Sequence, residues 1–379
     1  MPESVRLCRG EKIIAWLSVT AKLARRPNGL SVSQVMFCGI VEGLMKKETE
    51  SLRELLPDDH NLAQLDQIAV KGKNTIRARI ALGVELFIPP REQRQLYPAL
   101  NQLAEDYYRR FAPWLNSYSL SGSSRVSLMR KDFLKKLANK MANLNYEASY
   151  DTHLFYDDTG QGKIFNASPW QARFYGCGVN REDSLSSVVA SIPVCDEQGN
   201  PYFDTLLEMV LQWCNVVKPA FGTAGFCFSC SGPPSARYTW PLLQRHPGLD
   251  HMDDISFLVA TTYVEDKKRK YITNRIKGVN WLTVLGDALV EELGGLDRCR
   301  EALEPECHVQ PYDGGIVIMA GPMPQLGDTY QGIVPQRYRK VAAFTRPIRF
   351  EDYDGELIDV DEPLDSREAT LQWIRRFDD

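Results

Sequence analysis

Strict alternation of side chains over residues 76–88 limits the possible folds of this chain more than any other feature. Every second residue is apolar, so these side chains fall on one side of an extended backbone: Ile76, Ala78, Ile80, Leu82, Val84, Leu86 and Ile88. A period of two predicts a long β-strand. Pro89-Pro90 follows and ends it, because proline has no N–H to donate to a sheet. The sequence therefore predicts a sheet that contains this strand.

The order of strand, proline-containing loop and helix occurs twice. After the first strand, residues 91–111 place apolar side chains at helical spacing: Leu96, Leu100, Leu103, Tyr107 and Phe111. A strand, a loop, a helix and a further strand are predicted later at residues 186–194, 195–201, 202–217 and 221–231. This weak structural repeat favours two related α/β halves.

These patterns predict an α+β fold, in which antiparallel sheets carry helices packed on their faces. Two helices are expected in the N-terminal part, at residues 12–24 and 32–56. The chain is divided into a helical N-terminal unit, a first α/β half, a second α/β half and an acidic C-terminal segment, at residues 1–70, 71–175, 176–350 and 351–379.

Shorter patterns predict the remaining elements. Further strands are expected at residues 149–156, 164–175, 255–263, 338–344 and 348–350, and a hairpin joins 308–310 to 316–320. Further helices are expected at residues 130–140, near 238–243, at 296–303 and at 366–376. Residues 130–140 interleave basic and apolar side chains, which is typical of a solvated helix face over a core stripe, or of a patch for an anionic partner.

The stretch from Lys277 to Gly295 is interpreted as a complete helix. Apolar side chains recur at spacings of three or four: Trp281, Leu282, Leu285, Leu289 and Leu293. Asn280 would cap the first turn, and Gly294-Gly295 would end the last. Gly286 lies inside this helix at a cost of about 1 kcal/mol against alanine. The close approach of another backbone would explain it.

Charge is distributed unevenly along the chain. The net charge of −4 argues against wholesale binding to nucleic acid or to a membrane. Residues 351–379 hold eleven acids and three arginines, a net −8, which leaves −4 − (−8) = +4 on residues 1–350. A solvated, solubilising segment is the default interpretation of this acidic end. Because the chain opens without a signal-peptide pattern and no apolar run reaches the ~18–20 residues of a membrane helix, a cytoplasmic location is expected.

Two clusters carry possible chemistry. Cys227 and Cys230 form a lone C-x-x-C within a predicted strand, where buried structural cysteines are the simpler interpretation. His246, Asp250, His251 and Asp254 could together bind a divalent cation, although polar loops produce such clusters without a metal. The sequence has no nucleophile elbow, dinucleotide fingerprint or P-loop, and we predict no cofactor.

A set of ordered segments resembles a known family. The segments Gly278–Gly286, Leu293–Gly295 and Ala320–Asp328, followed by Pro335 and Tyr338, are similar to the C-terminal signature of the type VI secretion immunity family. The resemblance also takes in Tyr175-Gly176 and the segment from Phe203 to Gly248, and it spans residues 75–350. Size and organisation are similar to those of a pseudomonad member. This signature is structural rather than catalytic, so it carries over no active site.

The resemblance implies a non-enzymatic inhibitor that binds a cognate secreted toxin, often a nuclease of restriction-endonuclease-like fold. A nuclease cleft must be positive to hold phosphates, so a protein that plugs it gains from negative charge. The candidate partner-binding residues are Tyr330, Arg337, Arg339, Glu351, Asp352, Asp354, Glu356, Asp359, Asp361 and Glu362. Self-association remains open.

Two alternatives to an inhibitor stay open from the sequence. A metal-dependent hydrolase or modifying enzyme would use the residues between His246 and Asp254. A structural component of the secretion machine would assemble with its other parts instead of binding a toxin.

Overall fold

The computed structural model describes residues 62–378, with gaps at 73–74, 124, 160–165, 182, 233–235, 266–267 and 354. The helices predicted at residues 12–24 and 32–56 lie outside the described residues, as does most of the predicted N-terminal unit 1–70. Everything below concerns the described part of residues 56–379, which forms one contact unit.

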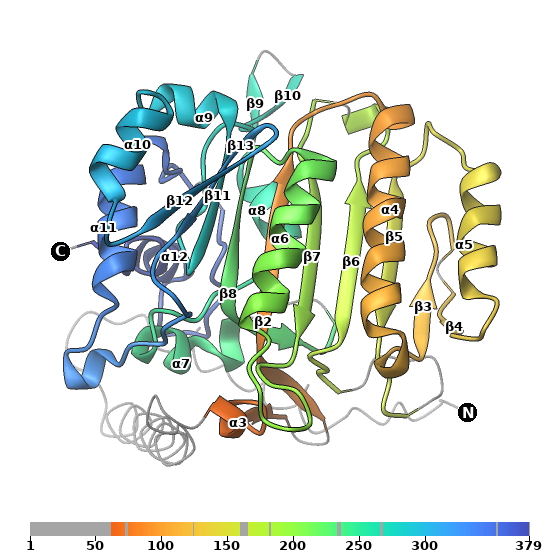
Figure 1. The fold of residues 1–379 in the computed structure, drawn as a ribbon, viewed down its shortest axis with the longest axis horizontal. Coiled ribbons are helices and arrows are strands. Elements are labelled where there is room, and N and C mark those ends of the chain that lie inside the picture. The colour runs from red at the N-terminus through yellow and green to blue at the C-terminus, as the bar shows by residue number, and fades with distance from the viewer. Residues whose placement is uncertain are drawn as a thin grey trace, which may run out of the picture. The chain divides into compact units, whose positions relative to one another are not determined.

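An eleven-stranded antiparallel sheet dominates this unit, and β2 (Ile76–Ile88) lies near its middle (Figure 1). Ten strands follow the order β12-β13-β11-β8-β2-β7-β6-β5-β3-β4, and the short β1 (Ala69–Lys71) also pairs with β2. The other strands are β3 (Ser117–Ser119), β4 (Ser127–Leu128), β5 (Tyr150–Phe155), β6 (Gln171–Gly176), β7 (Ser186–Ile192), β8 (Phe221–Cys230), β11 (Leu282–Gly286), β12 (His308–Tyr312) and β13 (Gly315–Met319). A separate hairpin joins β9 (Thr262–Glu265) to β10 (Lys268–Tyr271).

The predicted long strand is confirmed over the whole of β2. Its neighbours β7 and β8 come from the later repeat, so the sheet is continuous across residue 176. The predicted α+β class is confirmed as well. The division into residues 1–70, 71–175, 176–350 and 351–379 stays a prediction.

Helices cover both faces of the sheet. Figure 1 shows α4 (Gln93–Phe111) and α6 (Phe203–Val217) in front of the strands, with α8 (Asp254–Ala260) and α12 (Ser366–Ile374) behind them. The indole Nε1 of Trp213 on α6 donates to Asp106 Oδ2 on α4 at 2.8 Å, which ties the two front helices together. The other helices are α3 (Leu62–Leu65), α5 (Phe133–Ala142), α7 (Trp240–Arg245), α9 (Asp287–Glu292), α10 (Gly295–Leu303) and α11 (Gln336–Thr345).

The prediction of one helix over residues 281–293 is wrong. β11 occupies Leu282–Gly286, and only α9, Asp287–Glu292, is helical. All five residues of β11 are buried, because β8 and β13 flank it and other elements cover both of its faces. A strand buried on both faces is a continuous apolar run, in which helical spacings occur by chance. The expected close backbone approach at Gly286 is present, since a Cβ there would lie 2.7 Å from Pro219 O.

Three predicted strands are also wrong. Residues 255–263 belong largely to α8, which begins because the Asp253 carboxylate accepts from the Ser256 N–H at 2.9 Å. Residues 338–344 belong to α11, which buries Tyr338, Val341, Ala342 and Thr345 at helical spacing. Residues 346–348 form a short 3₁₀ turn in place of the strand at 348–350. These apolar runs are too short for period alone to separate helix from strand.

Candidate partner-binding surface

Lys277, at the start of the signature stretch, lies in a buried cluster of charges behind the sheet. Its ammonium contacts the carboxylate of Glu85 on β2 and lies 3.6 Å from Asp250 Oδ1. It also donates to the backbone oxygen of His251 at 3.0 Å. The exposed fractions of the Lys277, Glu85 and Asp250 residues are 2%, 0% and 1%. Charges removed from water to this degree must be paired.

Polar side chains around Asp250 complete its environment. Thr223 Oγ1 on β8 donates to Asp250 Oδ2 at 2.8 Å, and Asn280 Nδ2 lies 3.5 Å from the same oxygen. The Oδ1 atom of Asn280 accepts from the Trp281 N–H at 2.7 Å. Asn280 therefore joins the cluster to β11 and does not cap a helix as predicted.

Burial and pairing set the protonation of this cluster. Burial raises the pKa of Glu85 to about 8, against the opposing effect of Lys277. Burial also acts to raise the pKa of Asp250, but Lys277 and Arg376 outweigh it and hold that pKa below its ordinary value. Burial alone would lower the pKa of Lys277, yet Asp250 and Glu85 raise it. The Lys277 ammonium thus pairs with the Asp250 carboxylate, while Glu85 keeps a proton at neutral pH.

The C-terminal segment closes over this cluster. Arg376 donates to the backbone oxygens of Pro247 and Val279 at 2.8 and 3.1 Å, and its guanidinium carbon lies 3.9 Å from the ring centroid of Trp373. Lys277 Nζ lies 5.6 Å from the same ring centroid. Because Trp373 is buried on α12, the end of the described chain is part of the core.

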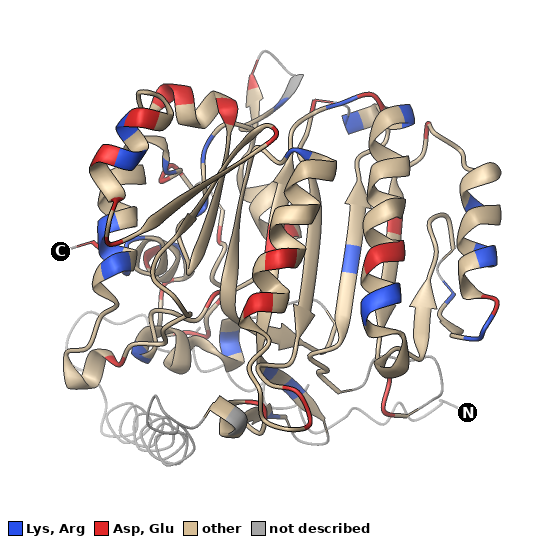
Figure 2. Ribbon diagram, viewed as in Figure 1, with Lys and Arg blue, Asp and Glu red and all other residues tan. Residues whose placement is uncertain are grey.

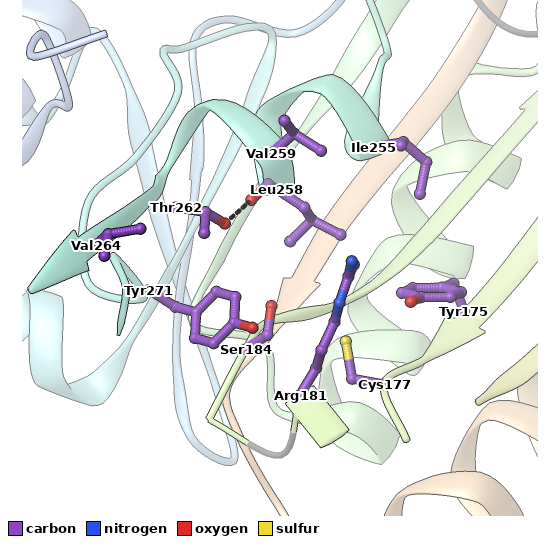
Figure 3. A pocket seen from close by; sticks show the side chains of 10 residues that line it. All are labelled: Tyr175, Cys177, Arg181, Ser184, Ile255, Leu258, Val259, Thr262, Val264 and Tyr271. Atoms are coloured by element: carbon purple, nitrogen blue, oxygen red, sulfur yellow. Dashed lines mark hydrogen bonds between the residues drawn. The ribbon is translucent and has the colours of Figure 1, made fainter. Parts of the chain in front are cut away.

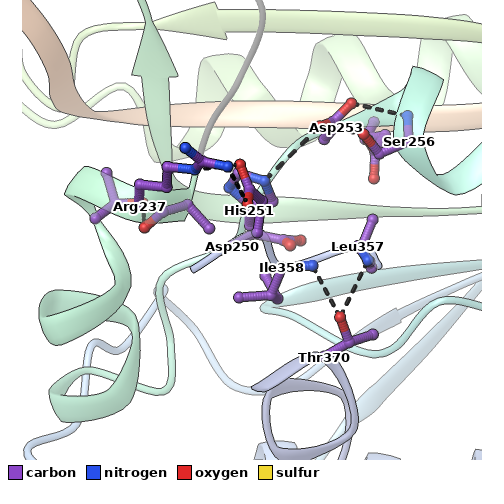
Figure 4. Close-up of polar contacts among 12 residues, drawn as sticks. Arg237, Asp250, His251, Asp253, Ser256, Leu357, Ile358 and Thr370 are labelled. Atoms are coloured by element: carbon purple, nitrogen blue, oxygen red, sulfur yellow. Dashed lines mark hydrogen bonds and ion pairs between the residues drawn. The ribbon is translucent and has the colours of Figure 1, made fainter. Parts of the chain in front are cut away.

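The residues of the hydrolase hypothesis are buried and already have protein contacts. His246 Nδ1 lies 2.6 Å from Gly327 O, and His251 Nε2 lies 3.9 Å from Asp253 Oδ2. Asp253 caps α8, and Asp254 accepts from the Ser187 hydroxyl (Figure 4). Burial lowers the pKa of His251 to about 4.

These positions do not converge on a metal site. Within the part of the chain that the structure describes, no group of three or more His, Cys, Asp or Glu side chains could hold a metal ion. The arrangement therefore gives the hydrolase hypothesis no support.

The two cysteines of the C-x-x-C lie on β8, as predicted, and both are buried free thiols. Cys227 packs with Ala81 and Met252 behind the sheet. Burial raises the pKa of the Cys227 thiol well above its ordinary value. Such a thiol is a core group rather than a nucleophile.

The candidates at Tyr330, Arg337 and Arg339 lie on a proline-rich loop and the helix after it. Tyr330 is 54% exposed, and its ring lies 5.3 Å from the guanidinium carbon of Arg245. Arg245 forms a two-nitrogen ion pair with Asp328, with contacts of 2.6 to 3.1 Å. Arg337 is exposed on α11, whereas Arg339 is half-buried.

The acidic C-terminal segment is not the solvated tail that its composition predicts. Its apolar side chains pack on the body of the protein, with Tyr353, Leu357 and Ile358 buried. Thr370 Oγ1 accepts from the backbone N–H groups of both Leu357 and Ile358 (Figure 4). The low net hydrophobicity of this segment concealed its regularly placed apolar residues.

Two of the candidate carboxylates in this segment are engaged within the protein. Glu351 contacts Arg349 and Arg375, and Asp359 pairs with Arg237 at 2.6 Å. The exposed candidates are Asp352, Glu356, Asp361 and Glu362, and Asp354 lies outside the described residues. Figure 2 also shows acidic positions on α6, α9 and α10, so negative charge alone does not single out this segment.

Residues 99–377 match the family described as type VI immunity for VRR-NUC. The chain belongs to this family. The matched range includes most of the sheet, Lys277 and Asp250 of the buried cluster, and the C-terminal segment. The predicted family membership is confirmed.

A solved structure shares the fold. The chain is similar to the Pseudomonas aeruginosa T6SS protein PA0821, with a TM-score of 0.67 and 23% sequence identity. The similarity covers 83% of this chain and 87% of that one. No curated protein matches the chain. Among the described residues, no helix is long and apolar enough to span a membrane.

Sequence reasoning missed the partnership of Glu85 and Lys277. One signal was present: Glu85 is the single acid within the long apolar strand, between Val84 and Leu86. An acid in a central strand requires a buried partner. The identity of that partner, 192 residues away, could not be read from spacing.

Proposed function

We propose that this protein is an immunity protein that binds and neutralises a VRR-NUC nuclease of its own type VI secretion system. The observation that carries this proposal is the family match over residues 99–377. The neutralised nuclease would act on cytoplasmic nucleic acid, so we place the immunity protein in the cytoplasm. Its action is non-enzymatic and requires a stoichiometric complex.

The exposed carboxylates of the C-terminal segment are proposed as one part of the contact. Asp352, Glu356, Asp361 and Glu362 are held on a packed segment, so a partner would meet them at little entropic cost. A cleft that holds phosphates is lined by positive charge, and an acidic face would occupy it in place of nucleic acid. Glu351, Asp354 and Asp359 extend this set.

Tyr330, Arg337 and Arg339 are proposed as a second part of the contact. Tyrosine and arginine are enriched among the residues that carry most of the energy of protein interfaces. Tyr330 and Arg337 are exposed, and the ion pair between Arg245 and Asp328 supports the loop that carries Tyr330.

Co-expression tests the proposal. Each VRR-NUC protein encoded in the same genome is expressed in a sensitive bacterium, alone and with the full chain. We expect one nuclease to kill its host alone, to be tolerated with the chain, and to elute with it as a complex on gel filtration. Killing that the chain never relieves, for any of these nucleases, contradicts the proposal.

A further inference from the structure

A groove lies beside α8, away from the buried cluster. Its volume is about 320 Å³. Three segments frame it: the end of β6 with the turn after it, α8, and the β9–β10 hairpin (Figure 3). Its wall includes Tyr175, Arg181, Ile255, Val259, Val264 and Tyr271.

Exposed apolar side chains gather on these three segments. The exposed fractions of Val259 and Val264 are 63% and 72%. Val179, Ile255 and Tyr263 on the same segments are 40%, 38% and 41% exposed. Single exposed apolar residues need no explanation, but a group around one groove marks a contact surface.

Arg181 supplies the charge of this surface. Of the described residues that line the groove, Arg181 alone carries a full charge, and none of the ion pairs among described residues uses it. Figure 3 shows its guanidinium directed between Leu258 and Tyr175. Arg173 nearby differs, because Asp151 engages it at 2.9 and 3.0 Å. A groove with apolar walls and one uncommitted guanidinium fits an apolar side chain that stands next to a carboxylate.

The groove is continuous with the acidic segment across α8. The ring centroids of Phe257 on α8 and Tyr353 lie 6.5 Å apart. A Cβ on Gly355 would lie 4.0 Å from Ala260 Cα. The exposed carboxylates at Asp352 and Glu356 therefore flank one side of the short helix, and the groove flanks the other.

We propose that this groove docks the cognate nuclease, which inserts an apolar side chain between α8 and the β9–β10 hairpin and presents an adjacent carboxylate to Arg181. This inference rests on the proposed function and names the part of the surface that anchors the complex. The carboxylates beyond α8 then face the basic cleft of the same partner. Val259 lies at the centre of the buried area.

Photo-crosslinking in the full chain tests this placement. A benzoyl-phenylalanine is introduced at Val259, and separately at Leu128 on β4 as a control that is 44% exposed. Each variant is co-expressed with the VRR-NUC proteins of the same genome, and adducts are identified by mass spectrometry. We expect a nuclease adduct from position 259 and none from position 128.

Affinity measurements add a matched pair of charge reversals. Arg181→Glu is expected to weaken the complex with the captured nuclease at least about tenfold, as loss of an interface hot spot does. Arg130→Glu reverses another exposed arginine and is expected to change the affinity less than about twofold. Equal effects of the two reversals would overturn the role of Arg181.

The crosslinking outcomes separate this inference from the proposed function. A nuclease that co-purifies but crosslinks only from other positions overturns the groove and leaves the proposed function standing. An adduct from position 259 to a second copy of the chain, or to residues 1–61, gives the groove a different occupant and overturns the inference. If no VRR-NUC protein is captured at any position, both fail.

Discussion

Two groups of charged residues behind the sheet differ in one respect, which is access to water. Lys277 and Asp250 are 2% and 1% exposed, and each contacts an opposite charge. Arg181 and Glu356 are exposed, and no ion pair among the described residues uses either of them. The same chemical groups therefore serve different ends on the two sides of α8.

Buried charges stabilise a structure only through their partners. Desolvation costs each ion several kcal/mol, and a single missing partner leaves that cost without compensation. Exposed charges keep their hydration and contribute little to folding, so they are available to another molecule. On this comparison, the charged residues closest to the family signature maintain the fold, and the binding surface lies where charges and apolar groups remain exposed.

Removal of Lys277 is the strongest way to break this comparison. Lys277→Met keeps much of the side-chain volume but leaves Asp250 without its cation, so we expect a loss of about 3–5 kcal/mol in the free energy of unfolding. Urea unfolding measures it, and Lys270→Met, at an exposed position, is the control. A loss below about 1 kcal/mol would show that the cluster does not depend on its ammonium.

Removal of Trp373 tests whether the C-terminal segment is core. Trp373→Ala deletes a fully buried indole beneath Arg376, and the expected loss in the free energy of unfolding is about 3–5 kcal/mol. Leu364→Ala, in the same segment but 45% exposed, is expected to cost less than about 0.5 kcal/mol. Similar losses in both variants would restore the interpretation of this segment as a solvated tail.

Sequence patterns predicted β2 and the β12–β13 hairpin, because a half-buried period or a glycine turn fixes these elements locally. They failed at β11 and α8, where short apolar runs satisfy both periods and neighbouring elements decide. The buried cluster was equally out of reach, since Glu85 and Lys277 meet only after the sheet has formed. The groove around Arg181 combines three separate segments, and no linear pattern unites them.

The protonation of Glu85 gives a smaller, pH-dependent effect. The pKa of Glu85 is about 8 when folded, against an ordinary value of 4.5, so the folded chain holds a proton that the unfolded chain releases. The stabilising effect of this proton is fully present below pH 4.5 and is lost as the pH rises to about 8. Glu85→Gln cannot titrate, so its stability should not show this decline.

Urea unfolding at constant ionic strength, from pH 5 to pH 9, measures the effect. We expect the stability of Glu85→Gln relative to the unmodified chain to rise by an amount on the order of a few kcal/mol across this range. Glu356→Gln changes an exposed acid and should leave the pH profile unaltered. Parallel profiles for Glu85→Gln and the unmodified chain would mean that Glu85 is ionised beside Lys277 throughout.

Neutralising the exposed carboxylates sharpens the other half of the comparison, with the smallest expected effect on folding. The combined change Asp352→Asn, Glu356→Gln, Asp361→Asn and Glu362→Gln removes surface charges only, so each should alter the free energy of unfolding by less than about 0.5 kcal/mol. Association with the nuclease should slow and lose part of its salt dependence, because opposite charges accelerate encounter. Stopped-flow association rates at several salt concentrations measure this. The matched control neutralises Glu291, Glu292, Asp297 and Glu301 on α9 and α10, and an equal slowing there would assign the effect to net charge instead of to this surface.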